Sequence, residues 1–153
     1  MAGLMAGKRG LIMGVANDHS IAWGIARSLH SQGAELAFTY QHAAFERRVR
    51  PLAASVGSDL VLPCDVEQES AIAGTFADLC KTWPSIDFVV HAIAHSDKEE
   101  LKGRYLNTSR SNFRRTLSIS CYSFTAVARE AAGLMPDGGS LITLTYLGAE
   151  RVT

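Results

Sequence analysis

The feature that most constrains this chain is a strict alternation between short apolar runs and longer segments with helical periodicity. The apolar runs lie at residues 10–15, 34–40, 59–66, 86–94 and 139–146. Apolar residues three and four positions apart, the spacing typical of helices, mark the segments 20–33, 47–56, 69–83 and 113–132. Strands that alternate with helices through short connections favour a parallel sheet with helices on both faces.

The connections between the strands define the expected fold further. Crossovers between parallel strands are nearly always right-handed, so five such strands form a doubly wound sheet. We therefore predict an α/β fold with a Rossmann-like doubly wound parallel sheet and buried strands, the last at 139–146 included. No linker divides the chain, which predicts one dinucleotide-binding domain over residues 1–153. Pro51 would fit the first turn of the helix expected at 47–56.

Composition excludes several classes of protein. The 15 basic and 15 acidic side chains cancel and are scattered, which argues against a nucleic-acid partner. No run approaches the roughly 18 to 20 apolar residues of a membrane span, and the N-terminus lacks the pattern of a secretory signal, so we expect a cytoplasmic protein without a membrane partner. The three cysteines are widely spaced and lack paired histidines, which predicts buried free thiols and no metal site.

The first strand is followed by the turn at 14–24, which reads GVANDHSIAWG. In an open parallel sheet this turn faces the phosphates of a bound nucleotide, where a helix N-terminus offers unpaired N–H groups. Gly14 would allow a sharp turn, and Ser20 would cap the helix. The turn does not match G-x-G-x-x-G, so a plain strand-turn-helix connection remains an alternative.

Polar and small residues close the next three strands. Gln41 could hydrogen-bond a ribose, and we expect NAD as the cofactor. Because Gln41 could not repel a 2′-phosphate as Asp does, this residue does not exclude NADP. Asp65 could accept a hydrogen bond from an adenine amino group while Val66 packs on the ring, or it could cap the following helix. The run at 91–94 leaves room for a nicotinamide ribose, and we expect His91 to be buried and satisfied by backbone groups.

Five stretches together resemble one family. They lie at 14–26, 33–41, 61–66, 89–94 and 144–151, the last reading LTYLGAER. Over residues 7–153 the chain is similar to NADH-dependent enoyl-acyl-carrier-protein reductases, a divergent branch of the short-chain dehydrogenase/reductases. The resemblance implies reduction of trans-2-enoyl thioesters on acyl carrier protein in fatty acid biosynthesis, with hydride passing from NADH to the enoyl β-carbon. It also implies a homotetramer.

The resemblance assigns roles to single positions. Ser96 matches a substrate-binding position, although the family usually carries Phe-Ala where this chain has His95 and Ser96. Cofactor contacts are implied at Gly14, Ser20, Ile21, Gln41, Asp65, Val66 and Ile93.

Tyr146 matches a catalytic-site tyrosine of lesser, shaping role. In the family a principal tyrosine follows ten residues later and a lysine seven residues after that, both beyond Thr153. We therefore expect a chain that is the N-terminal three fifths of such an enzyme and has little or no turnover alone. A catalytically silent dinucleotide-binding or assembly module is the alternative, and a reductase of 3-ketoacyl thioesters is a third reading.

Overall fold

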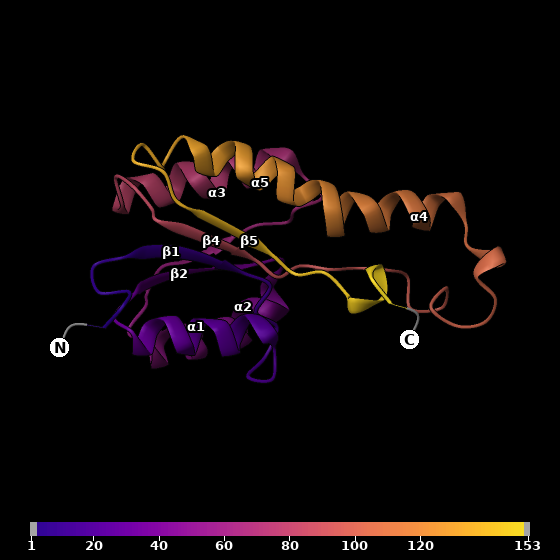
Figure 1. Ribbon diagram of the computed structural model, residues 1–153, viewed down its shortest axis with the longest axis horizontal. Helices are drawn as coiled ribbons and strands as arrows, with labels where there is room; N and C mark the ends of the chain where they lie inside the picture. The colour runs from indigo at the N-terminus through magenta and orange to yellow at the C-terminus, as the bar shows by residue number, and fades with distance from the viewer. Residues whose placement is uncertain (1–2, 152–153) are drawn as a thin grey trace.

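A parallel sheet lies between two pairs of helices in the computed structural model, which describes residues 3–151 (Figure 1). The strands are β1 (Arg9–Met13), β2 (Glu35–Tyr40), β3 (Val61–Pro63), β4 (Phe88–His91) and β5 (Ser140–Thr143). The α-helices are α1 (Ile21–Ser31), α2 (Ala43–Ser55), α3 (Glu69–Thr82), α4 (Arg110–Leu117) and α5 (Ser123–Ala132). Short helical turns are η1 (Tyr105–Asn107), the π-helical η2 (Ser118–Tyr122) and η3 (Leu147–Ala149).

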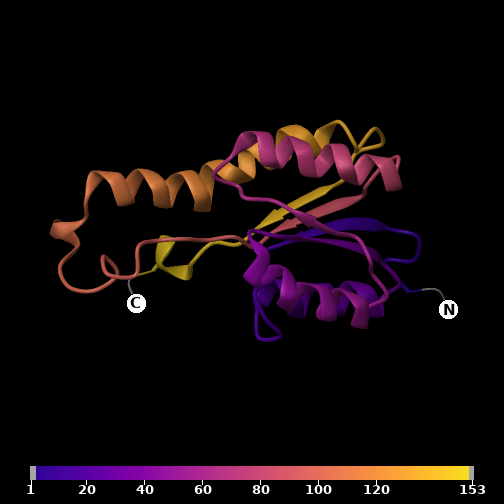
Figure 2. The same ribbon diagram turned by 180° about the vertical axis from the view of Figure 1, so that it is seen from behind.

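The strand order is β3-β2-β1-β4-β5, with all neighbouring strands parallel. Two views from opposite sides agree that α1 and α2 cover one face, while α3 and α5 cover the other (Figures 1 and 2). The predicted doubly wound sheet is therefore confirmed. The chain leaves β1 towards β2 on one side and reaches β4 on the other, so a crevice opens at the carboxyl ends of β1 and β4.

Consecutive apolar residues in the central strands explain the two layers of helices. Leu11 and Ile12 point to opposite faces of the sheet, and both are fully buried. Leu11 joins the core under α3 and α5, together with Val89. Ile12 joins the core over α1 and α2, together with Val90. A strand with no polar face needs cover on both sides, and this is the physical reason for the three-layer arrangement.

The second helix differs from its prediction. It begins at Ala43 rather than near residue 47, so Pro51 lies in its interior and not in its first turn. Proline lacks an N–H group and leaves the carbonyl of the residue four positions earlier, Arg47, without its helical partner. Because Pro51 and Arg47 are both exposed, water can satisfy that carbonyl.

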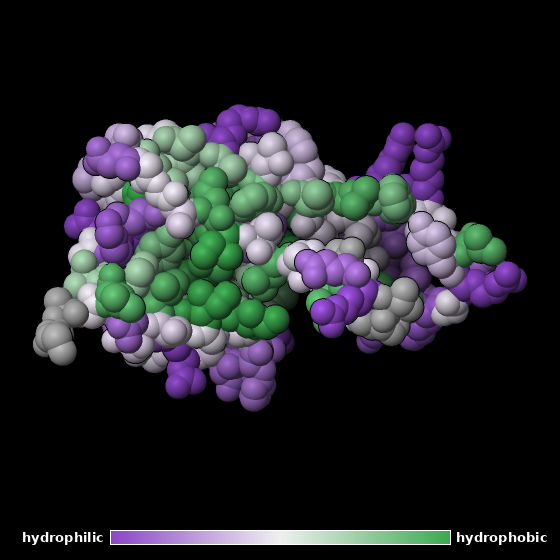
Figure 3. Space-filling view, viewed as in Figure 1, coloured by the Kyte–Doolittle hydropathy of each residue, from purple (hydrophilic) through white to green (hydrophobic). Residues whose placement is uncertain are grey.

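The expectation of a buried last strand was wrong. β5 pairs with β4, and within residues 3–151 no strand pairs with its other edge. Leu141 and Ile142 are 37% and 47% exposed. Figure 3 shows a continuous apolar surface over this strand. Hydrophobic sequence identified the strand correctly but not its place at the edge of the sheet.

The helix expected at 113–132 begins three residues earlier, at Arg110, and is interrupted by the π-helical turn η2. Its first half, α4, extends beyond the sheet on the side of the strands' carboxyl ends (Figure 1). In the part of the chain that the structure describes, no helix is long and apolar enough to cross a membrane.

Candidate functional site

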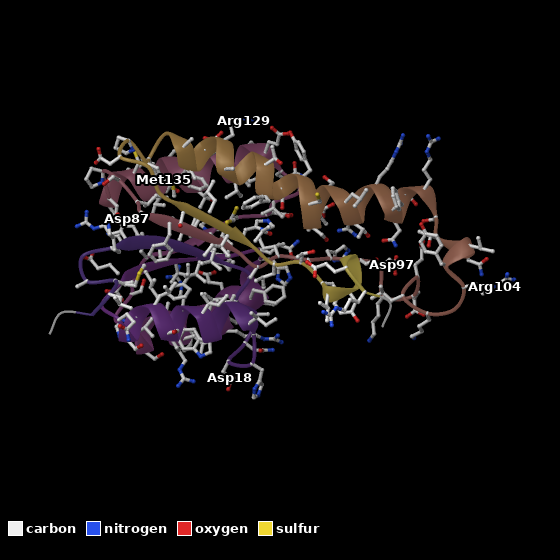
Figure 4. All side chains as sticks on the ribbon, in the orientation of Figure 1. Asp18, Asp87, Asp97, Arg104, Arg129 and Met135 are labelled. Carbon is white, nitrogen blue, oxygen red and sulfur yellow. The ribbon has the colours of Figure 1, made fainter. Side chains whose placement is uncertain are left out.

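A cleft of about 240 Å³ lies at the carboxyl ends of the strands. Figure 4 shows the direction of the sheet, because Asp87 precedes β4 at one end and Asp97 follows it beyond the other. The lining residues come from the turn after β1, the ends of β2 and β3, the segment after β4 and the π-helical turn η2. Four of the predicted cofactor residues, Gly14, Gln41, Val66 and Ile93, lie in this lining.

The base of the cleft depends on a glycine. Gly14 has a φ angle of 100°, a conformation that side chains with a Cβ rarely adopt. A Cβ at this position would also collide with the carbonyl oxygen of Ala92 and would lie 2.6 Å from its carbonyl carbon. The turn after β1 and the segment after β4 therefore approach each other more closely than any other residue type at position 14 permits.

Ser20 is the N-cap residue of α1, as predicted, but its side chain makes no capping hydrogen bond to the helix. Its Oγ instead accepts hydrogen bonds from the N–H groups of Ala16 and Asn17, each at 2.9 Å, and donates to the carbonyl of Asn17 at 2.8 Å. The serine thus holds the turn, and within the described residues the N–H groups of Ile21 and Ala22 have no hydrogen-bond acceptor. A helix N-terminus with unpaired N–H groups attracts anions.

Gln41 and Asp65 meet where β2 and β3 end. Gln41 Nε2 donates to Asp65 Oδ1 at 3.4 Å, and the same oxygen accepts from the N–H of Glu67 at 3.2 Å. Asp65 therefore stabilises the turn before α3 and does not cap that helix, whose N-cap is Gln68. In the described part of the chain, Asp65 Oδ2 accepts no hydrogen bond, while Val66 is buried in the cleft lining.

His91 is fully buried beneath the cleft. Its Nε2 lies 2.7 Å from Ser123 Oγ, and its Nδ1 lies 3.1 Å from Thr143 Oγ1. Ser123 gives its only hydrogen to the carbonyl of Ile119 at 2.6 Å, so Nε2 of His91 must carry the proton and Nδ1 must accept from Thr143. Burial lowers the pKa of His91, which favours this neutral ring. The expected burial is confirmed, but hydroxyl groups rather than backbone groups satisfy the ring.

Ser96 lies beside α4 and not in the cleft lining. Its Oγ accepts hydrogen bonds from Asn112 Nδ2 and from Thr116 Oγ1, both at 3.2 Å. These two bonds use both acceptor positions of the hydroxyl and leave its hydrogen for a further acceptor. Tyr146, also predicted for the site, follows β5 and is 73% exposed, outside the cleft lining.

Several cleft residues were not predicted. Tyr40, next to Gln41, and His95, two residues after Ile93, could have been found as neighbours of predicted residues. Phe45 from α2 and Ile119 from η2 carry no such signal, because only the packing of helices brings them to the cleft.

One side-chain nitrogen of His95, Nε2, is buried without a hydrogen bond within the described residues. A buried polar atom without a partner reduces stability.

The cysteines differ partly from expectation. Cys64 is buried in the cleft lining, and burial raises the pKa of its thiol, which keeps it protonated. Cys80 and Cys121 are exposed, so burial was wrongly predicted for them. Residues 3–151 contain no group of three side chains that could bind a metal ion.

The chain matches the family model described as enoyl-(acyl carrier protein) reductase over residues 14–153. It is 61% identical over 152 residues to enoyl-acyl-carrier-protein reductase (NADH) 2 of Rhizobium meliloti strain 1021, covering 99% of this chain and 57% of that protein. FabI of Rickettsia bellii strain RML369-C, also named an NADH enoyl-acyl-carrier-protein reductase, is 51% identical over 150 residues. This chain covers 57% of that relative too, and 98% of this chain is aligned.

Solved structures give the same result. FabI from Candidatus Liberibacter asiaticus superposes with a TM-score of 0.97 and 57% identity, covering 100% of this chain and 59% of that chain. The reductase from Anaplasma phagocytophilum, solved in complex with NAD, superposes with a TM-score of 0.95 and 54% identity. That comparison covers 99% of this chain and 58% of the other.

Proposed function

This chain belongs to the enoyl-acyl-carrier-protein reductase family, and we propose that it forms the NADH-binding portion of a reductase of trans-2-enoyl thioesters. The thioester would be carried by acyl carrier protein in fatty acid biosynthesis. The main support is the cleft at the carboxyl ends of β1 and β4, which Gly14, Gln41 and Val66 help to line. Close to these residues in the chain, the N–H groups of Ile21 and Ala22 and the Oδ2 of Asp65 have no hydrogen-bond partner within the described residues.

The residues fit a dinucleotide. The N–H groups of Ile21 and Ala22 would bind the pyrophosphate, and Ser20 would hold the turn that exposes them. Asp65 Oδ2 would accept from the adenine amino group while Val66 packs against the ring. NADH, when bound, supplies the hydride, and the chain orients it.

Two further cofactor residues complete this proposal. Gln41 would contact the adenosine ribose, and Ile93 would lie near the nicotinamide half. We propose NADH rather than NADPH, because the neutral Gln41 supplies no positive charge and its partner Asp65 would repel a 2′-phosphate.

Two residues, Ser96 and Tyr146, would form part of the thioester-binding side of the site. The Ser96 hydroxyl donates no hydrogen bond within the described residues, and we propose that it would donate one to the acyl substrate. Tyr146 would shape the substrate site at the end of β5. We also propose a cytoplasmic homotetramer.

A catalytically silent dinucleotide-binding module is the second candidate. It is favoured by one observation, namely that the cleft gathers four of the seven predicted cofactor residues while Tyr146 is 73% exposed outside it.

Calorimetric titration with NADH and NADPH, followed by an assay with crotonyl thioester, separates these functions. We expect NADH to bind more tightly than NADPH, and Asp65→Ala to weaken NADH binding about tenfold or more, since hydrogen bonds to charged groups contribute about 1.5–3 kcal/mol. Asp59→Ala, which removes an exposed aspartate before β3, is the matched control. Because this chain is expected to have little or no turnover alone, the crotonyl thioester assay is made on the chain joined to the segment that its relatives carry beyond Thr153. NADH binding without turnover in that extended protein would favour the silent module, and an absence of NADH binding would refute both functions.

A further inference from the structure

One helix contacts both sides of the cleft. Arg115 in α4 binds Glu67 in the turn after β3, with Nε to Oε1 and Nη2 to Oε2 each at 2.8 Å. The two parallel hydrogen bonds orient as well as attract, as expected for a bidentate guanidinium and carboxylate pair. The Arg115 guanidinium also lowers the pKa of Glu67, so the pair stays charged. Val66, which lines the cleft, directly precedes Glu67.

The opposite side is attached five residues further along the same helix. Ser120 Oγ in η2 accepts from the N–H of His95 at 3.0 Å and donates to the carbonyl of His95 at 3.1 Å. A single hydroxyl thereby satisfies both backbone groups of a residue in the cleft lining. Ile119, between these two attachments, is 5% exposed and itself lines the cleft.

These contacts determine the separation between the two sides. Backbone hydrogen bonds to the neighbouring strands reach as far as Cys64, whose N–H donates to Tyr40 at 2.8 Å, and Ala92, whose N–H donates to Met13 at 3.0 Å. Beyond these two residues, the backbone of Val66 and His95 makes no hydrogen bond to a strand within the described residues. Both sides are also attached to one continuous helical segment, the turn after β3 through Arg115 in α4 and the segment after β4 through Ser120 in η2. A slot whose sides are already ordered binds a flat ring without an additional entropy cost.

We propose that Arg115 and Ser120 are positioning residues for the adenine ring of a bound nucleotide, which lies in the slot between Val66 and His95 with Ile119 at its base. This inference rests on the proposed function, because it requires the cleft to take the adenosine half of the cofactor. Neither residue contacts the ligand. Each acts through the side of the slot that it holds.

The test measures the binding affinity for each half of the cofactor separately. Adenosine monophosphate, nicotinamide mononucleotide and NADH are titrated calorimetrically into the wild-type protein and into Arg115→Met, Ser120→Ala and the double variant. We expect Arg115→Met to weaken adenosine monophosphate and NADH binding about two- to fivefold, the range for an exposed ion pair. Ser120→Ala should weaken both about three- to tenfold, the range for a neutral hydrogen bond. Affinity for nicotinamide mononucleotide should not change.

Matched variants separate positioning from general loss of structure. Arg50→Met removes an ion pair to Glu46 in α2 with nearly equal exposure, because the arginine is 52% exposed in both pairs and the glutamates are 29% and 26% exposed. It should leave all three affinities unchanged. Ser120→Thr keeps the hydroxyl and should restore adenosine monophosphate binding, whereas Arg115→Lys keeps the charge without the fork and should restore it only partly.

The outcomes distinguish this inference from the proposed function. Equal weakening of both mononucleotides, or no weakening in folded variants, would overturn the positioning role while wild-type NADH binding still supports the proposed function. If Ser120→Ala does not fold, Arg115→Met decides alone, since it alters only an exposed side chain. Failure of the wild-type protein to bind NADH would refute the proposed function itself.

Discussion

Replacement of Gly14 by alanine is the most direct perturbation of the turn that carries the cleft. The φ angle of 100° is unfavourable for alanine, and residues held in such regions cost about 1–3 kcal/mol. The new Cβ would also overlap the carbonyl group of Ala92, which is backbone and cannot rotate away. Overpacking of this kind costs a further 1–3 kcal/mol, roughly. We therefore expect Gly14→Ala to lower the free energy of unfolding by about 2–6 kcal/mol.

Gly24, in the helix that follows this turn, provides the control. Gly24 lies in α1, is exposed, and a Cβ there would have no atom within 4 Å. Gly24→Ala should therefore raise the free energy of unfolding by about 0.5–1 kcal/mol, because alanine favours the helix. Urea unfolding followed by circular dichroism measures both variants, and calorimetry shows whether Gly14→Ala also loses NADH binding. A loss below about 1 kcal/mol in Gly14→Ala would refute the close approach of the two segments.

Three other predictions concern single ionisable or polar groups. Burial lowers the pKa of His91 below its ordinary value, so the free energy of unfolding is at its full value above about pH 6.5 and falls as the pH drops through the folded pKa, by up to about 1.4 kcal/mol per pH unit. His91→Asn should flatten this dependence in urea unfolding over a pH series, and an unchanged slope would contradict the assignment. His95→Phe removes a buried nitrogen without a partner among the described residues, and calorimetric melting should show stability higher by about 1 kcal/mol; a lower melting temperature would count against it. Lys8, 2.7 Å away, lowers the pKa of Asp87, whose contribution is present above its unfolded pKa and is lost as the pH falls through its folded pKa. Asp87→Asn should therefore cost about 0.5–1 kcal/mol at neutral pH and almost nothing near pH 2, and equal losses at both pH values would exclude the ion pair as the cause.

Local residue preferences were sufficient for much of the fold. The apolar runs predicted the strands, since fully apolar strands need cover on both faces. Gly14 was predicted as a turn residue, and the structure adds the reason, which is contact with Ala92 as well as a positive φ angle. The helix containing Pro51 was misplaced because its first turn, from Ala43, carries a weak apolar pattern.

Hydrogen-bond partners could not be predicted in the same way. Ser20 has the residue type and position of a helix cap, yet it bonds the preceding turn, because its Oγ lies within reach of two other N–H groups. Asp65 likewise bonds Gln41 and its own turn. A sequence indicates which groups can donate or accept, but the choice among partners depends on distances that only the folded backbone sets.

By itself, the sequence determined the alternation of strands and helices, the direction of the sheet and the strand ends at which Gly14, Asp65 and Ile93 lie. These follow from periodicity and backbone preference, which act over a few residues. Tertiary structure alone decided the exposed edge at β5 and the attachment of one helix to both sides of the cleft through Arg115 and Ser120. Such contacts join residues about 25 to 48 positions apart, and their energies depend on packing that no local pattern specifies.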